Sequence, residues 1–225
     1  MKTTDDFIYP AADIWAAAVA AQRINKKYIK ITNYSDLPGN YGIMGYILRG
    51  EAAGGSVYAI TDDDREQAVI IRKFFQNLMF EYLRGSLAGY LTAAFQVSLL
   101  ENININDMDM TPLIASLPST WAGEQKKINN RRVIDALEAA SAPWGKVGQK
   151  LPDNFDIRVV TSVYSKKFGT FAINAVQDNH LFFFWWNCDL KENSILRVCG
   201  RVKQHYKNRT TQLSIVKGTV LDATN

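Results

Sequence analysis

The stretch Leu196-Arg-Val-Cys-Gly-Arg-Val-Lys-Gln-His205 alternates apolar and polar residues. Successive side chains of a β-strand point to opposite faces, so the stretch divides into two rows. One row is Leu196, Val198, Gly200 and Val202, and the other is Arg197, Cys199, Arg201, Lys203 and His205. We expect the first row to face a core. The second row carries cations about 6.6 to 7 Å apart, close to the phosphate repeat of an extended single strand. An ordinary charged solvent face explains the second row equally well.

Alternating stretches continue on both sides of this strand, from about Phe155 to the C-terminus. We expect Phe155, Ile157, Val159 and Val163 on one face of a first strand, followed by a turn over residues 164–169. A second strand should contain Phe171, Ile173 and Ala175, and a tight turn over 177–179 should precede an apolar strand over 181–186. Roughly five short strands in about 75 residues predict a small closed barrel, because closure removes exposed strand edges.

The apolar strand Leu181-Phe-Phe-Phe-Trp-Trp186 places bulky side chains on both of its faces. Phe182, Phe184 and Trp186 form one row, and Leu181, Phe183 and Trp185 form the other. Only one row can fill the barrel, so the other must be covered by the N-terminal region, by a partner or by bases. OB-folds hold single strands on aromatic side chains beside a basic groove. Our hypothesis places Trp186 outside; burial of the outer row under the N-terminal region is the alternative.

The residues before the barrel show helical periodicity. A helix is expected over residues 11–31, and glycines predict a loop-rich or short-stranded connector over 33–55. Thr61-Asp-Asp-Asp64 predicts a helix start, and helical spacing continues to Leu99 with a break near Gly85 or Gly89. A further helix over 125–139 carries Lys126, Lys127, Arg131 and Arg132, a cluster typical of a solvated face or of phosphate contacts.

These patterns together predict an α+β protein with two domains. We expect a mainly helical domain over residues 1–140 and a five-stranded OB-type β-barrel over residues 141–225. The positive charge lies mostly in the second part, which has 12 Lys and Arg against 6 Asp and Glu, whereas the whole chain has a net charge of +4. Such asymmetry indicates a polyanion partner for the basic part. No apolar run approaches the ~20 residues of a membrane span, so no membrane partner is expected.

The sequence contains no familiar catalytic signature. A P-loop, a dinucleotide fingerprint, a His-x-x-x-His helix and a Cys-x-x-Cys pair are all missing. Cys188 and Cys199 are too few for a disulfide framework, and His180 and His205 are too few for a His-rich metal site. Asp107 and Asp109 are interpreted as a polar loop and helix cap. We therefore expect a protein that is not an enzyme, with no catalytic residue, no metal and no cofactor.

Several segments of the C-terminal part resemble a known family. They are Ser141-Ala-Pro-Trp-Gly-Lys-Val-Gly-Gln-Lys150, Tyr164-Ser-Lys-Lys-Phe-Gly169, the strand with Trp185 and Trp186, Gly200-Arg-Val-Lys-Gln-His205 and Thr210-Thr-Gln-Leu213. Together they resemble an OB-fold domain found in bacteriophage replication-associated proteins, over about residues 141–221. The resemblance implies binding of single-stranded DNA, in the cytoplasm of an infected bacterial cell.

We expect a single-stranded DNA-binding protein of phage replication, recombination or transcription. RNA as ligand, replication or transcription proteins as partners, and the oligomeric state stay open. The expected contact residues are basic and aromatic residues of the barrel: Trp144, Lys146, Lys150, Tyr164, Lys166, Lys167, Phe184, Trp186, Arg197, Arg201, Lys203, His205, Tyr206, Lys207 and Arg209. The alternative is a protein–protein adaptor whose barrel binds a replication, transcription or host factor.

Overall fold

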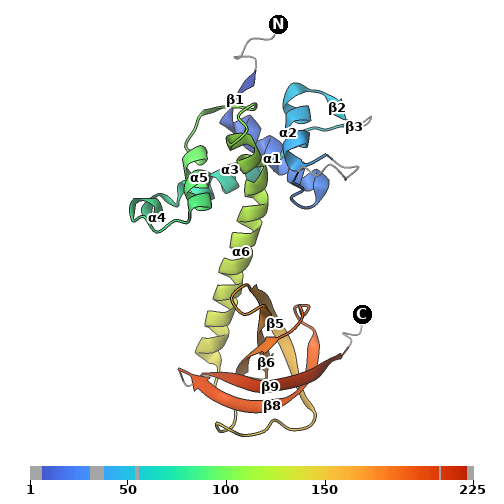
Figure 1. Ribbon diagram of the computed structural model, residues 1–225, viewed down its shortest axis with the longest axis vertical. Helices are drawn as coiled ribbons and strands as arrows, with labels where there is room; N and C mark the ends of the chain where they lie inside the picture. The colour runs from blue at the N-terminus through green and yellow to red at the C-terminus, as the bar shows by residue number, and fades with distance from the viewer. Residues whose placement is uncertain (1–6, 31–37, 54–55, 208, 222–225) are drawn as a thin grey trace. The chain divides into compact units, whose positions relative to one another are not determined.

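The computed structural model describes residues 7–30, 38–53, 56–207 and 209–221. The chain divides into two compact units, Met1–Gln125 and Lys126–Asn225. Helices dominate the first unit and a closed β-barrel dominates the second, which confirms the α+β class (Figure 1). Within the described ranges, no helix combines the length and the apolar character needed to cross a membrane.

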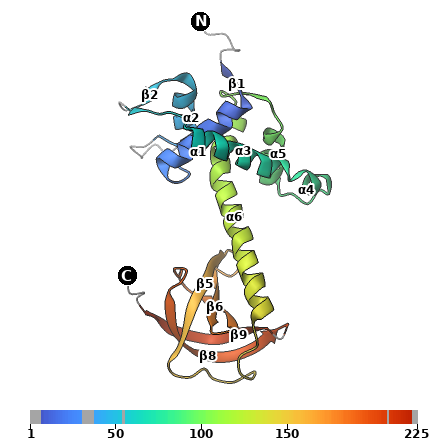
Figure 2. The same cartoon turned by 180° about the vertical axis from the view of Figure 1, so that it is seen from behind.

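The N-terminal unit consists of helices joined by short strands. Its elements are β1 (Ile8–Pro10), α1 (Ala11–Asn25), α2 (Asn40–Arg49), β2 (Ala52–Ala53), β3 (Ser56–Val57), α3 (Asp62–Gln76), α4 (Met79–Leu83), α5 (Gly89–Ser98), β4 (Asn102–Asn104) and the first part of α6 (Met110–Ala140). Two small antiparallel sheets pair β1 with β4 and β2 with β3. Helix α1 packs on α2 and α3, as Figure 2 shows for α1 and α3.

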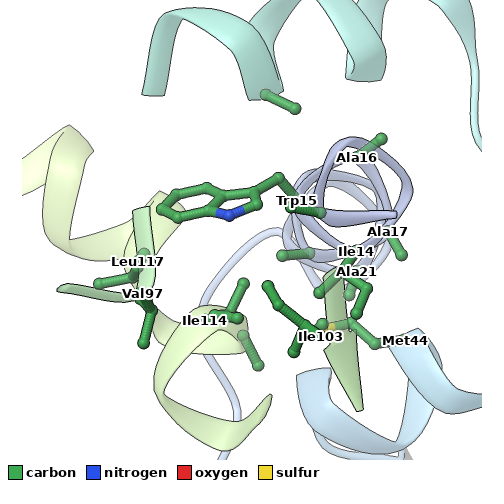
Figure 3. Close-up of a cluster of buried hydrophobic side chains, with 14 of the residues drawn as sticks. Ile14, Trp15, Ala16, Ala17, Ala21, Met44, Val97, Ile103, Ile114 and Leu117 are labelled. Atoms are coloured by element: carbon green, nitrogen blue, oxygen red, sulfur yellow. The ribbon is translucent and has the colours of Figure 1, made fainter. Parts of the chain in front are cut away.

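The core of this unit is built around α1. Trp15 is fully buried, and Figure 3 shows its ring in a cluster with Ile103 of β4 and with Ile114 and Leu117 of α6. Six of the seven alanines of α1 are buried, because small side chains let neighbouring helices approach closely. The helix expected over 11–31 ends earlier, at Asn25, and Lys26 after it has a left-handed conformation with a φ of 58°. Residues 31–37 lie outside the described residues.

Helix α3 begins as the sequence predicted. The Thr61 hydroxyl accepts a hydrogen bond from the backbone N–H of Asp64 at 3.2 Å, and the Asp64 carboxylate accepts one from the Thr61 N–H at 2.9 Å. Arg23 of α1 also forms an ion pair with Asp64 at 2.8 Å. Burial opposes ionisation of Asp64, but the hydrogen bonds from Arg23 and Thr61 outweigh it and lower its pKa below the ordinary value.

Two helices differ from the sequence prediction. Helix α2 occupies part of the expected connector over 33–55, of which 33–37 and 54–55 lie outside the described residues. Burial of Ile43 and Met44 outweighs the low helix propensity of Gly42 and Gly45, each about 1 kcal/mol less favourable than alanine. Helix α6 starts at Met110 rather than near 125, and Asp107 caps it by accepting from the Met110 N–H at 2.8 Å.

The second unit contains the five-stranded OB-type barrel, as predicted. Its strands are β5 (Phe155–Ser165), β6 (Thr170–Gln177), β7 (His180–Trp186), β8 (Ile195–Tyr206) and β9 (Thr210–Leu221). They close in the order β5-β6-β7-β9-β8, and every pairing is antiparallel except that of β7 with β9. The end of α6, from Lys126, belongs to the same compact unit, whereas the expected domain boundary lay at the end of that helix.

A register shift changes the predicted core row of β5. The shift between Val159 and Thr161 adds a residue to β5, so Val163 leaves the core row of Phe155, Ile157 and Val159 and is exposed. A one-residue offset moves every following side chain to the other face of a sheet. The row of Leu196, Val198, Gly200 and Val202 on β8 is buried as predicted.

Candidate nucleic-acid interface

OB-folds bind oligonucleotides across their second and third strands and beside the loops that join strands one to two and four to five. In this barrel those strands are β6 and β7, and those loops connect β5 to β6 and β8 to β9. The outer side of β6 and β7 is therefore the expected ligand-binding surface of this barrel.

The outward aromatic residue of β7 at this place is Trp185. Its side chain is 37% exposed, and its ring lies 4.8 Å from that of Phe168 and 5.4 Å from that of Phe183, centroid to centroid. The prediction that Trp186 faces outward is wrong. Trp186 packs against the barrel core with its ring 6.0 Å from Phe184, because it shares the parity of the buried row.

The prediction that Phe184 contacts the ligand is also wrong. Its side chain is fully buried inside the barrel, as is that of Phe182, so no base can reach it. Trp144 has a similar packing role: its ring lies 5.1 Å from Phe155 and 6.3 Å from Phe182. Three of the predicted aromatic residues, Trp144, Phe184 and Trp186, thus pack in or against the core, and the exposed Trp185 was not among the predicted contact residues.

Exposed apolar side chains from three elements meet beside Trp185. Val163 on β5 pairs in register with Ala172 on β6, which pairs in register with Trp185 on β7. Phe168, from the loop between β5 and β6, is 57% exposed, and Val163 is 48% exposed. We call Val163, Phe168, Phe183 and Trp185 the aromatic face.

The loop between β5 and β6 adds positive charge to the aromatic face. Lys166 and Lys167 are both exposed there, and the Lys167 ammonium lies 5.3 Å from the centroid of the Phe168 ring. Gly169 has a φ of 64°, a conformation that favours glycine and closes the turn. Tyr164, at the end of β5, is exposed and has its ring 5.2 Å from Phe171. The predicted residues Tyr164, Lys166 and Lys167 are therefore accessible.

The end of β8 and the loop that follows it carry Tyr206, Lys207 and Arg209, all exposed. The Tyr206 hydroxyl donates to the Gln212 side chain at 3.2 Å. The Arg209 guanidinium donates at 3.4 Å to the carbonyl oxygen of Glu138, in the last turn of α6. Arg209 thus binds the end of a helix.

The basic row of β8 lies on a different side of the barrel. Strand β9 separates β8 from β7 in one direction, and β5 and β6 separate them in the other. The predicted single groove, with basic and aromatic residues side by side, is therefore two surfaces. We call the exposed cations of the β8–β9 side, Lys150, Arg201, Lys203 and Lys217, the basic face.

Arg197 and His205 do not extend the basic face. Arg197 donates to both carboxylate oxygens of Asp156, at 2.7 and 2.8 Å, which lowers the pKa of Asp156 and balances the charge of the guanidinium. His205 leaves the row because the register shifts between Val202 and Gln204. Its Nδ1 lies 3.3 Å from the hydroxyl of Thr211, a buried residue.

The remaining predicted basic residues are Lys146 and the cluster on α6. Lys146 is exposed in the segment before β5, where its backbone N–H donates to Gln149 Oε1 at 2.8 Å. On α6, Lys126 forms an ion pair with Glu192 at 3.1 Å, and Arg131 forms one with Asp135 at 3.0 Å. Much of the helix cluster is therefore balanced by acidic neighbours.

Comparison with known proteins gives little additional guidance. No family model matches the chain, and no solved structure matches it. Among curated proteins, the chain is 30% identical over 118 residues to acetylglutamate kinase of Streptococcus sanguinis strain SK36. The match covers 52% of this chain and 44% of that protein, so the chain spans less than half the length of this relative.

The match with a kinase contradicts one expectation. We expected that the protein is not an enzyme, because familiar catalytic signatures are missing from the sequence. Missing signatures argue only against the reactions that use them. A relative named as a kinase overturns that expectation, and we do not maintain it.

Proposed function

We propose that the barrel binds single-stranded DNA across the aromatic face, in replication, recombination or transcription of a bacteriophage. The observation that carries the proposal is the exposed pair of Trp185 and Phe168 with Lys167 beside it, on the side of the barrel where OB-folds take their ligands. The resemblance of the motifs over 141–221 to phage proteins supports the biological role. Such a role belongs in the cytoplasm of an infected bacterial cell.

The chemistry of the aromatic face suits an unpaired strand. Each base that stacks on an exposed aromatic ring contributes about 1 to 3 kcal/mol, with little dependence on sequence. In a duplex the base faces are already stacked on one another, so Trp185 and Phe168 would find no partner there. Lys166 and Lys167 can contact phosphates next to the stacked bases, and such contacts weaken as salt is added.

The proposal is tested by fluorescence anisotropy with labelled single-stranded DNA, single-stranded RNA and duplex DNA of equal length, using the full chain. We expect single strands to bind more tightly than duplex. The double variant Lys166→Glu/Lys167→Glu should bind more weakly and reduce the dependence of log affinity on log salt by about 1.4, or about 0.7 per lost phosphate contact.

The matched control is Lys27→Glu/Lys30→Glu, which makes the same change of net charge at exposed positions in the other compact unit. It should leave DNA affinity nearly unchanged. Equal affinity for duplex and single strands would refute the proposal. Failure to bind any nucleic acid at low salt would favour the protein–protein adaptor, for which the aromatic face would then be the docking surface.

The match with acetylglutamate kinase favours a second candidate, phosphoryl transfer to acetylglutamate. Catalysis of phosphoryl transfer depends on positioning and on positive charge around the transferred group. The test is release of ADP from ATP by the full chain, with and without acetylglutamate. Turnover that requires acetylglutamate supports this candidate, and the same ADP release with and without it removes the candidate.

A further inference from the structure

The basic face contains a hollow that takes no part in binding at the aromatic face. Between the strands β8 and β9 lies a hollow of about 210 Å³, lined by Lys150, Cys199, Gly200, Arg201, Ile215 and Lys217. Three of its six lining residues are cations. We call it the β8–β9 hollow.

The backbone around the β8–β9 hollow departs from regular pairing. Between Cys199 and Arg201 the register shifts, so that Cys199 pairs with Lys217 and Arg201 with Ser214. A Cβ on Gly200 would lie 3.2 Å from the carbonyl oxygen of Ser214, so glycine permits the close approach of β9. Ile215 lies in the shifted segment with a φ of 53°, which is rare and strained for a β-branched residue, and its side chain is 74% exposed.

The charge of the β8–β9 hollow is not balanced from within the described residues. Lys150 lies 3.3 Å from Asp153, but both side chains are mostly exposed, so this pair is weak. The hydrogen bond that the Arg201 guanidinium donates to a described residue goes to the carbonyl of Gly148, a neutral group, at 3.3 Å. Among the described residues, Lys217 has no acidic partner in ion-pair contact. Three cations therefore face one exposed carboxylate.

We propose that the β8–β9 hollow binds phosphate groups of the nucleic-acid backbone, beyond the segment held on the aromatic face. The inference rests on the proposed function and adds a second contact region for the same strand. Arg201 presents a planar guanidinium that can bind two phosphate oxygens at once, and Lys150 and Lys217 supply point charges on either side. Exposed Ile215 offers an apolar contact for a sugar or a base.

Two contact regions make binding depend on the length of the strand. OB-folds cover between about 4 and about 16 nucleotides, so an oligonucleotide of about 4 nucleotides should occupy the aromatic face alone, and one of about 16 should reach both regions. Arg201→Glu/Lys217→Glu should leave the affinity for the short strand nearly unchanged. It should lower the affinity for the long strand by about tenfold or more and reduce its salt slope by about 1.4.

Cys199 provides an independent readout, because its side chain lines the hollow and is partly exposed. In a Cys188→Ser background, Cys199 is the single remaining thiol of the chain. The long strand should slow its reaction with a thiol reagent, whereas the short strand should not. Lys27→Glu/Lys30→Glu again controls for net charge, and melting temperatures confirm that each variant is folded.

The outcomes separate this inference from the proposed function. If the long strand binds no more tightly than the short one, or if the double variant binds both normally, the inference is wrong while binding at the aromatic face stands. If neither strand binds the wild-type protein, both proposals are wrong. Protection of Cys199 without any effect of the double variant would also overturn the inference, because the contact would then not involve these cations.

Discussion

Neighbouring tryptophans on β7 allow a sharp test of the aromatic face. Trp185 points outward with 37% of its side chain exposed, whereas Trp186 packs against the barrel core. Trp185→Ala removes a stacking ring, so the affinity for single-stranded DNA should fall by about 1 to 3 kcal/mol, or roughly 5- to 150-fold. Its unfolding free energy should fall by about 1 kcal/mol, since the ring lies on the outer side of the barrel and loses its contacts with Phe168 and Phe183 but none in the core.

Trp186→Ala should show the opposite pattern. Replacing a fully buried Phe or Trp by Ala lowers the free energy of unfolding by about 3 to 5 kcal/mol. Trp186 is partly buried, so we expect a loss of about 2 to 3 kcal/mol. Urea unfolding measures the stability of both variants, and anisotropy under folded conditions measures their affinity. If both variants lose similar stability and neither loses affinity, both rings are packing residues. The assignment of the aromatic face to DNA must then be abandoned.

Three further predictions concern the fold and its pH dependence. Phe182→Ala should destabilise the barrel by about 3 to 5 kcal/mol in urea unfolding, because the ring is fully buried against Phe155; a change below about 1 kcal/mol would contradict this packing. Gly218→Ala should also destabilise the barrel, since the added Cβ would collide with the carbonyl oxygen of Arg197, and an unchanged melting temperature would contradict that contact. The pKa of Asp64 is lower in the folded protein than its ordinary value, so the carboxylate contributes stability above the unfolded pKa near 4 and loses it as pH falls through the folded pKa. Asp64→Asn should therefore lower the stability at pH 7 by about 2 kcal/mol and flatten its decrease at acid pH, and an unchanged profile would refute the role of the Arg23 pair.

The sequence predicted the elements whose pattern is local. Alternation on β8 identified the buried row of Leu196, Val198, Gly200 and Val202, and Thr61 with Asp64 identified the start of α3. Both signals depend on side-chain period or on a cap within a few residues, and tertiary structure did not change them.

Features that depend on distant pairing escaped prediction. The register shifts after Val159 and Val202 depend on pairing with the neighbouring strands. The alternation within one strand therefore could not predict that Val163 is exposed or that His205 turns toward Thr211. Which of Trp185 and Trp186 faces outward likewise depends on the partner strands. Trp186 shares its row with Phe182 and Phe184, which favoured an inward position for Trp186. Lys217 was missed because its pairing with Cys199 brings together residues from two strands.

Photo-crosslinking with iododeoxyuridine in single-stranded DNA tests the central claim most directly, because this base reacts preferentially with aromatic side chains that it contacts. Peptide mapping of the full chain should find the adducts at Trp185 or Phe168, on the aromatic face, and Trp185→Ala should reduce their yield. Adducts confined to residues 7–125, or to the α6 cluster around Lys126 and Arg131, would contradict the account and place DNA binding elsewhere in the chain.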